Sequence, residues 1–184
     1  MGADGHFRVT LSLRREPAAG PVYCKMETSA RFRQLKTVKL SCEATYRLDI
    51  SFKPPQLLEW VQERKRRKTS EGRNMHLSLS IGGKQVETIE RARDGTACAY
   101  SAYHSTKGIP ASARGHREEL PIAMRVLGSG YLTTCLQIKY YRQDDQSHCE
   151  WGARLHCIEL DCSSVEGRLV TVDRETYRKL GIES

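Results

Sequence analysis

Residues 131–162, YLTTCLQIKYYRQDDQSHCEWGARLHCIELDC, decide the fold, because two runs typical of β-strands flank a polar connection. The runs Tyr131–Tyr141 and Arg154–Leu160 combine β-branched and aromatic residues with alternating apolar positions. Between them lie residues whose side chains hydrogen-bond their own backbone, and Gly152 allows the chain to bend. The stretch therefore predicts a β-hairpin, with Trp151 as the buried anchor of its turn.

Alternation of apolar and polar residues continues along the rest of the chain. It is clearest in Phe7–Leu13 and Thr45–Phe52, where one face of each predicted strand is apolar. The Gly82-Gly83 pair can supply the positive φ angles of a hairpin turn between Leu77–Ile81 and Gln85–Ile89. With these, about nine strands are predicted. The others are Val22–Met26, Thr37–Leu40, Ala97–Tyr103 and Pro121–Val126.

One segment breaks the alternation. Residues 56–68 follow two prolines that suit the start of a helix, and their apolar residues recur at helical spacing. A short helix is predicted there, with an apolar face formed by Leu57, Trp60 and Val61.

Strands separated by turn signals, with few helices, are typical of an antiparallel sandwich rather than of alternating βαβ units. The predicted fold class is therefore all-β. By its length the chain is expected to form a single β-sandwich domain over residues 1–184, with residues 58–75 as a basic helical insertion or loop within it. Near the end, Asp173 is predicted to cap a short turn that runs to Lys179.

The charge of the chain is concentrated in one place. The net charge is +8, and the run ERKRRK at Glu63–Lys68 has five bases and one acid, so it supplies 5 − 1 = 4 of those charges. Stacking aromatic residues are not interleaved with these bases, so nucleic acid is not a predicted partner. The run is either a solvated helix end or a docking site for anionic lipid headgroups or an acidic peptide. The predicted partner-binding residues are Arg64, Lys65, Arg66, Arg67 and Lys68.

An apolar pocket is a second predicted site. The apolar faces of Thr45–Phe52 and of the predicted helix either fill a solid core or line a hydrophobic cavity that residues 55–61 close. The predicted pocket residues are Tyr46, Leu48, Ile50, Phe52, Leu57, Trp60 and Val61.

The seven cysteines favour a reducing, cytosolic compartment, because the count is odd and no apolar run suits a signal peptide or a membrane span. All seven are predicted to be reduced. Zinc is not predicted, because the Cys-x-x-Cys spacing is missing and neighbouring strand residues point to opposite faces. The residues weighed as zinc ligands are His148, Cys149, His156, Cys157 and Cys162.

An enzyme is not predicted either. Cys149 lies beside His148, but no third residue that would orient the histidine is apparent. The acidic pairs Glu118-Glu119 and Asp144-Asp145 lie in polar loops, where solvated carboxylates are expected rather than an acid–base pair. No cofactor is predicted.

Several short motifs carry a resemblance to a known family. The sequence HCEWG at residues 148–152, followed by IELDC at residues 158–162, resembles the corresponding tract of the cannabinoid receptor-interacting protein family. The likeness covers nearly the whole chain, except for an apparent insertion at residues 58–75 and the tail Thr176–Ser184. The other segments, in the same order as in the family, are Gly20–Tyr23 followed by Lys25, Arg31-Phe32, Lys39-Leu40, Lys53-Pro54, Leu79–Gly83 and Gln137-Ile138-Lys139.

The resemblance implies an immunoglobulin-like sandwich similar to that of Rho GDP-dissociation inhibitors, whose hydrophobic cavities take lipidated cargo. It also implies a non-catalytic cytosolic adaptor that binds the C-terminal tail of a G protein-coupled receptor, the type-one cannabinoid receptor, and modulates its signalling. The expected location is peripheral, at the inner face of the plasma membrane. The alternative is a carrier for an acylated or prenylated protein, such as a lipidated G protein, and an anionic membrane surface is a further predicted partner.

Overall fold

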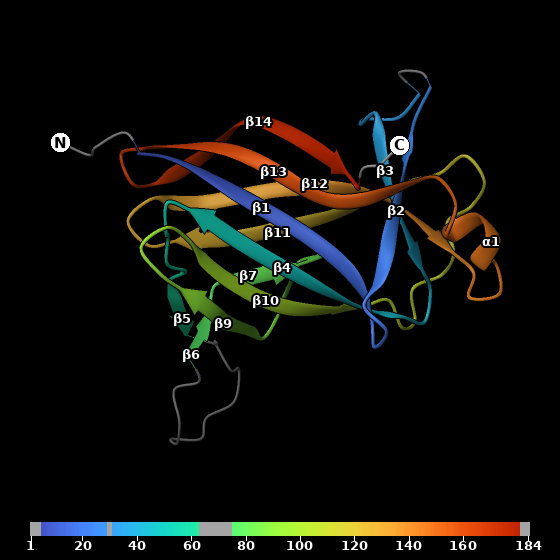
Figure 1. The fold of residues 1–184 in the computed structure, drawn as a ribbon, viewed down its shortest axis with the longest axis horizontal. Coiled ribbons are helices and arrows are strands. Elements are labelled where there is room, and N and C mark those ends of the chain that lie inside the picture. Colours follow the sequence, from blue (N-terminus) through green and yellow to red (C-terminus); the bar gives the residue numbers. More distant parts are fainter. Residues whose placement is uncertain (1–4, 29–30, 63–74, 181–184) are drawn as a thin grey trace.

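The structure is a computed structural model that describes residues 5–28, 31–62 and 75–180. Its described part is almost entirely β, with one short helix. In Figure 1, β1, β4 and β10 cross in front of β11 and β12, so the sheet folds over into two layers. The elements are β1 (Gly5–Glu16), β2 (Gly20–Met26), β3 (Lys36–Ser41), β4 (Thr45–Lys53), β5 (Trp60–Gln62), β6 (Met75–Leu77), β7 (Leu79–Ile81), β8 (Lys84–Gln85), β9 (Thr88–Arg93), β10 (Cys98–Ser105), β11 (Glu118–Val126), β12 (Gly130–Tyr141), α1 (Gln146–Cys149), β13 (Ala153–Val165) and β14 (Leu169–Lys179).

Most strands belong to one mixed sheet in the order β8-β7-β11-β12-β14-β13-β2-β1-β4-β10-β9, and β3 bridges β12 and β2. Antiparallel pairs dominate, while β12 runs parallel to β3 and β14. The predicted all-β sandwich is confirmed. The described residues form fourteen strands rather than about nine, because short strands such as β5, β6 and β8 carry too few residues to show alternation.

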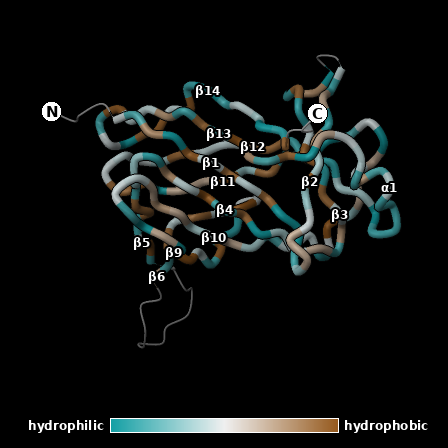
Figure 2. Tube along the Cα trace, in the orientation of Figure 1, coloured by the Kyte–Doolittle hydropathy of each residue, from teal (hydrophilic) through white to brown (hydrophobic). Residues whose placement is uncertain are grey.

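The core follows from the alternation seen in the sequence. Along β4 the apolar side chains are buried at every second position, and β11 shows the same pattern from Leu120 to Val126. Figure 2 shows hydrophobic and hydrophilic residues alternating along β1 and β4. Phe52 of β4 is fully buried, with its ring 6.1 Å from that of Phe7 and 6.0 Å, edge on, from that of Tyr100. Such contacts stabilise the sandwich beyond the burial of area alone.

The predicted hairpin of residues 131–162 is wrong, although both of its strands exist. β12 and β13 do not pair with each other: β12 pairs with β11, β3 and β14, and β13 pairs with β14, β1 and β2. The strand that lies between them, β14, comes last in the sequence. The polar connection is therefore a crossing from one part of the sheet to another, and it holds α1 rather than a tight turn.

The predicted helix is also wrong over the residues that the structure describes. Leu58 forms a β-bridge to Val126, and β5 pairs with β6. The backbone of this segment hydrogen-bonds the sheet instead of itself, since the Glu59 N–H donates to the Arg125 carbonyl, 2.9 Å away. Leu58, which lies outside the predicted apolar stripe, is the residue that is buried, while Trp60 is 62% exposed.

Two further predictions have opposite outcomes. The hairpin at Gly82-Gly83 is confirmed, because both residues have positive φ, at 62° and 79°, and connect β7 to β8. The short turn predicted from Asp173 to Lys179 is wrong. Those residues lie in β14, which pairs with β13 over ten positions and so satisfies its backbone groups.

All seven cysteines are free thiols in the structure, and six of them are buried. Burial raises the pKa of the Cys149 thiol to about 11, and that of the Cys162 thiol to about 12, so both are protonated at neutral pH. Buried, protonated thiols pack as small apolar side chains and react slowly.

We therefore expect the native protein to contain no disulfide. After unfolding without reductant, an alkylating reagent should add to all seven cysteines, which intact-mass spectrometry measures. In the folded state, Cys135 should react first, because it alone of the seven is not fully buried. A mass that is lower than that of the fully alkylated protein by two alkyl groups would reveal a native disulfide and contradict the expectation.

Candidate functional site

The outer face of β2, β3 and β12 carries three lysines close together. Lys139 of β12 is the register partner of Lys39 of β3, and Lys39 is in turn the partner of Tyr23 of β2. Lys25 comes two residues after Tyr23 and so lies on the same face. The topology thus places cations of β2 and β3, which are consecutive in the sequence, beside a cation of β12, which comes much later.

Lys39 is the buried centre of this cluster, at 5% exposure. Its ammonium donates to the backbone carbonyls of His148 at 2.9 Å and Trp151 at 2.6 Å, and it lies over the rings of Tyr141 and Trp151. Burial lowers the pKa of Lys39 below its ordinary value, and the nearby charges of Lys25 and Lys139 lower it further. Lys39 therefore fixes the connection that follows α1 to β3 through charge-assisted hydrogen bonds.

Trp151 forms one wall of the site. The prediction that its indole is buried is wrong, because the side chain is 74% exposed. Gly152 explains its position: φ is +118°, and a Cβ atom there would lie 3.1 Å from the Cys24 carbonyl oxygen. The chain thus turns tightly against β2 and leaves the indole beside the Lys39 ammonium rather than in the core.

The opposite wall is the loop of residues 106–117. Ser112 joins this loop to β12, because its N–H donates to the Tyr140 carbonyl and its hydroxyl accepts from the Tyr140 N–H, both at 2.9 Å. Between the two walls lies a groove of about 660 Å³. We call it the lysine groove. Its lining residues are Lys25, Lys39, Ala111, Ser112, Arg114, Lys139, Tyr140, Tyr141, Arg142, Asp145, His148 and Trp151.

A buried ion pair fixes the end of that loop. Arg117 and Glu27 have side chains that are 7% and 6% exposed, and their charged atoms lie 2.9 Å apart. Arg117 also lies over the ring of Phe32, and Thr37 donates to Glu27 at 2.8 Å. Desolvation raises the pKa of the Glu27 carboxyl, but the hydrogen bonds from Thr37 and Arg117 outweigh it, so the net pKa is lowered. Glu27 is therefore ionised at neutral pH.

The lysine groove has an excess of cations. Arg142 forms an ion pair with Asp144, and His148 Nδ1 lies within hydrogen-bond distance of the Asp145 carboxylate, at 2.6 Å. Within the described ranges, in contrast, none of the other four basic side chains forms an ion pair; they are Lys25, Lys39, Arg114 and Lys139. Desolvation lowers the pKa of Lys139, and the charges of Arg117 and Lys25 lower it further. The groove therefore favours an anionic ligand.

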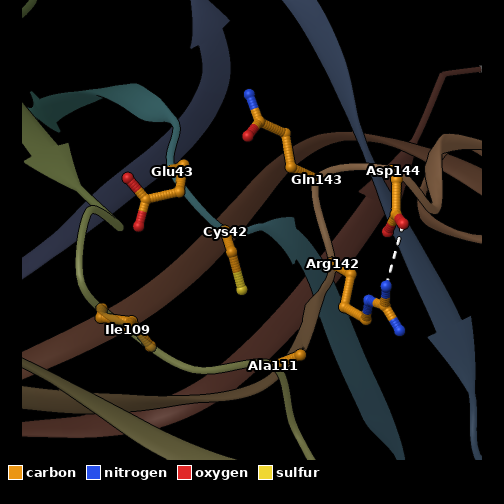
Figure 3. A pocket seen from close by; sticks show the side chains of 7 residues that line it. All are labelled: Cys42, Glu43, Ile109, Ala111, Arg142, Gln143 and Asp144. Carbon is orange, nitrogen blue, oxygen red and sulfur yellow. Dashed lines mark hydrogen bonds and ion pairs between the residues drawn. The ribbon is translucent and has the colours of Figure 1, made fainter.

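A second recess of about 480 Å³ adjoins the lysine groove and shares Ala111 and Arg142 with it. Figure 3 shows the Cys42 thiol pointing into this recess between Ile109 and Ala111. Its rim is acidic or polar, with Glu43, Gln143 and Asp144 around the opening. Together the two recesses offer an extended ligand a basic and aromatic part followed by a smaller part that favours neutral or basic groups.

The predicted site residues are only partly described. The basic run Arg64–Lys68 lies outside the described residues. Of the predicted pocket residues, four from β4 are almost fully buried in the core, Leu57 packs against it, Val61 is half-buried and Trp60 is exposed. The four from β4 are Tyr46, Leu48, Ile50 and Phe52. An apolar cavity at these residues remains a prediction.

The residues weighed for metal binding or catalysis do not form a site. Among the described residues, no group of three His, Cys, Asp or Glu side chains is placed to hold a metal ion. His156 is exposed while Cys157 is buried, so the two point to opposite faces of β13. The high pKa of Cys149 leaves it protonated rather than activated beside His148.

The family model described as CB1 cannabinoid receptor-interacting protein 1 matches residues 3–64 and 73–177 of this chain. The chain belongs to the CB1 cannabinoid receptor-interacting protein 1 family. The gap in the match, residues 65–72, falls within the insertion apparent in the sequence at residues 58–75. Most of the chain therefore has a counterpart in the family model, whereas most of the basic run Arg64–Lys68 falls in the gap of the match.

Relatives within the family are similar over almost their whole length. CB1 cannabinoid receptor-interacting protein 1 of Homo sapiens is 30% identical over 176 residues, which cover 94% of this chain and 96% of the relative. The proteins of the same name from Bos taurus and Mus musculus show the same identity and coverage. Their names state that they interact with the CB1 cannabinoid receptor. Among the described residues of this chain, no helix has the length and apolar character that crossing a membrane would require.

The lysine groove itself was not predicted from the sequence. A signal was present, because Lys39 and Lys139 each stand between apolar residues in predicted strands, as in Val38-Lys39-Leu40. Alternation alone places both lysines on an outer face. Only the parallel pairing of β3 with β12 shows that they lie side by side.

Proposed function

We propose that this protein is a non-catalytic adaptor that binds the cytoplasmic C-terminal tail of a cannabinoid-type G protein-coupled receptor and modulates its signalling. Membership of a family whose members are named for receptor interaction carries the proposal. The protein would act in the cytoplasm, at the inner face of the plasma membrane, where such a tail lies.

The lysine groove is the proposed binding site for the tail. It is recessed, lined by aromatic rings and rich in unpaired cations, and these properties suit an extended peptide that carries negative charge. Several separate motifs that carry the family resemblance also meet there. They supply Lys25, Lys39, Lys139 and Trp151.

Reversing the charge of the groove should weaken tail binding. We expect the double variant Lys25→Glu/Lys139→Glu to bind a synthetic tail peptide of the type-one cannabinoid receptor at least about tenfold more weakly in isothermal titration calorimetry, since each reversal turns attraction into repulsion. The matched control is Lys53→Glu/Lys84→Glu, which reverses two exposed charges outside the groove. Equal affinity of the two double variants for the peptide would contradict the groove as the binding site.

The basic run Arg64–Lys68 is a proposed second contact, to the tail or to an anionic membrane. Exposed charges act over about 8 Å at physiological ionic strength, so this contact should be strongest at low salt. Replacing the five basic residues by Ser should therefore weaken binding to the tail peptide or to anionic vesicles mainly in low salt. Binding that is unaffected at every salt concentration would leave the run as solvated charge.

The carrier of a lipidated protein is the alternative function. It requires the four buried side chains of β4 to part and admit an acyl or prenyl chain, and burial of each CH₂ group would contribute about 0.8 kcal/mol. An acylated tail peptide and its unmodified twin distinguish the two functions in the same titration. A preference of several orders of magnitude for the acylated peptide would favour the carrier, and equal affinity would leave the adaptor.

A further inference from the structure

We infer that the lysine groove recognises a phosphorylated serine or threonine in an extended peptide, so that phosphorylation of the bound tail would strengthen its binding. This inference rests on the proposed function, because it names the chemistry of the ligand that the same groove takes.

The number of unpaired cations is the first argument. Among the described residues, Lys25, Lys139 and Arg114 line the groove without forming an ion pair, Lys39 lies at its base, and Asp145 is the one acidic side chain in the lining. A carboxylate brings one negative charge, which leaves most of these cations uncompensated. A phosphoryl group brings about −1.5 to −2 charges and three acceptor oxygens at neutral pH, so a single side chain can accept hydrogen bonds from several of them.

The hydrogen-bond geometry is the second argument. The Lys39 ammonium donates two of its three N–H groups to the carbonyls of His148 and Trp151, and this fixes its position. Lys139 is its register partner on the neighbouring strand, so the two lysines lie side by side. The mutual repulsion of these lysines, which contributes to the lowered pKa of Lys39, is relieved when a dianion lies between them.

The shape of the site favours a peptide over a membrane as the source of the phosphate. The groove lies between the wall at Trp151 and the loop of residues 106–117, and the cations line this recess. The adjoining recess has Glu43 and Asp144 at its rim, which disfavours further acidic groups on the ligand. The ligand expected is therefore one phosphorylated residue flanked on one side by neutral or basic residues, rather than a uniformly acidic segment.

The experiment compares overlapping tail peptides of the type-one cannabinoid receptor, each unmodified and with one serine or threonine phosphorylated, by isothermal titration calorimetry. At least one phosphopeptide should bind about tenfold or more tightly than its unmodified twin, and the ratio should shrink as added salt screens the charges. In the variant Lys25→Met/Lys139→Met, the ratio should fall toward one. The variant Lys25→Met/Arg114→Met changes two exposed residues of the groove and should lower the same affinity ratio. The control variant Lys53→Met/Lys84→Met changes two exposed residues outside the groove and should keep the wild-type ratio.

The outcomes separate the inference from the proposed function. If the unmodified peptides bind and no phosphorylated twin binds more tightly, recognition of phosphate is overturned while the receptor-tail adaptor stands. If neither form binds, the proposed function fails and the inference fails with it. Tighter binding to vesicles that contain phosphoinositides than to any phosphopeptide, lost in the same lysine variants, would overturn the inference by assigning the phosphate to a lipid headgroup.

Discussion

Phe52→Ala is expected to lower the free energy of unfolding by about 3–5 kcal/mol, because removing a large buried aromatic side chain loses its burial and leaves a cavity. The Phe52 side chain is fully buried and contacts the rings of Phe7 and Tyr100. In contrast, Trp151→Ala should cost only about 0.5–1 kcal/mol, since the exposed indole loses mainly its contact with the Lys39 ammonium. Urea denaturation of the wild type and the two variants measures both losses of unfolding free energy, with one m-value used for all three proteins.

The comparison also tests the two interpretations of the β4 side chains. If Phe52 lined an open cavity of the kind that a lipid carrier needs, its ring would already lack close neighbours on one side. The alanine variant would then lose much less stability. A cost below about 1 kcal/mol for Phe52→Ala would therefore contradict a solid core and support the carrier.

The buried side chains of the sandwich could be predicted where apolar and polar residues alternate over a whole strand. In Thr45–Phe52 the four apolar positions can face one side only in a strand, and this local rule survives in the fold. The Gly82-Gly83 turn was predictable for a similar reason, because few other residues tolerate two successive positive φ angles.

Strand pairing was not predictable from neighbouring segments. Residues 131–162 contain two real strands, but each of them finds better partners elsewhere, and β14 lies between them although it comes last in the chain. The false helix has a related cause. A pattern of three apolar residues in Leu57–Val61 is too short to outweigh backbone hydrogen bonds that the sheet edge offers.

The site was missed because its signal is split among three strands. Trp151 was expected in the core on its size and apolar character, yet the indole is also a good partner for an ammonium, and Lys39 supplies one. The run Arg64–Lys68 drew attention because its charge is contiguous in the sequence. Lys25, Lys39 and Lys139 also carry positive charge but become a cluster only after folding.

The buried pair of Arg117 and Glu27 leads to the second large effect. Arg117→Met should lower the free energy of unfolding by about 3–5 kcal/mol, because it leaves the Glu27 carboxylate buried without its cation. The double variant Glu27→Met/Arg117→Met removes both charges and should recover much of that loss. Urea denaturation of the single and double variants measures the difference, and equal stability of the two would contradict a desolvated pair.

The pH dependence of this loss has a definite sign. The pKa of Glu27 is lower in the folded protein than its unfolded value of about 4.3, so the pair contributes its full stability above that pH and loses it as the pH falls through the folded pKa. The wild type should therefore lose this stabilisation below about pH 4, while the double variant lacks that part of the acid dependence.

Because Arg117 ends the loop that walls the lysine groove, the Arg117→Met variant should also bind the tail peptide more weakly at pH 7, where the fold remains intact. Unchanged peptide affinity would show that Ser112 alone holds the wall in place.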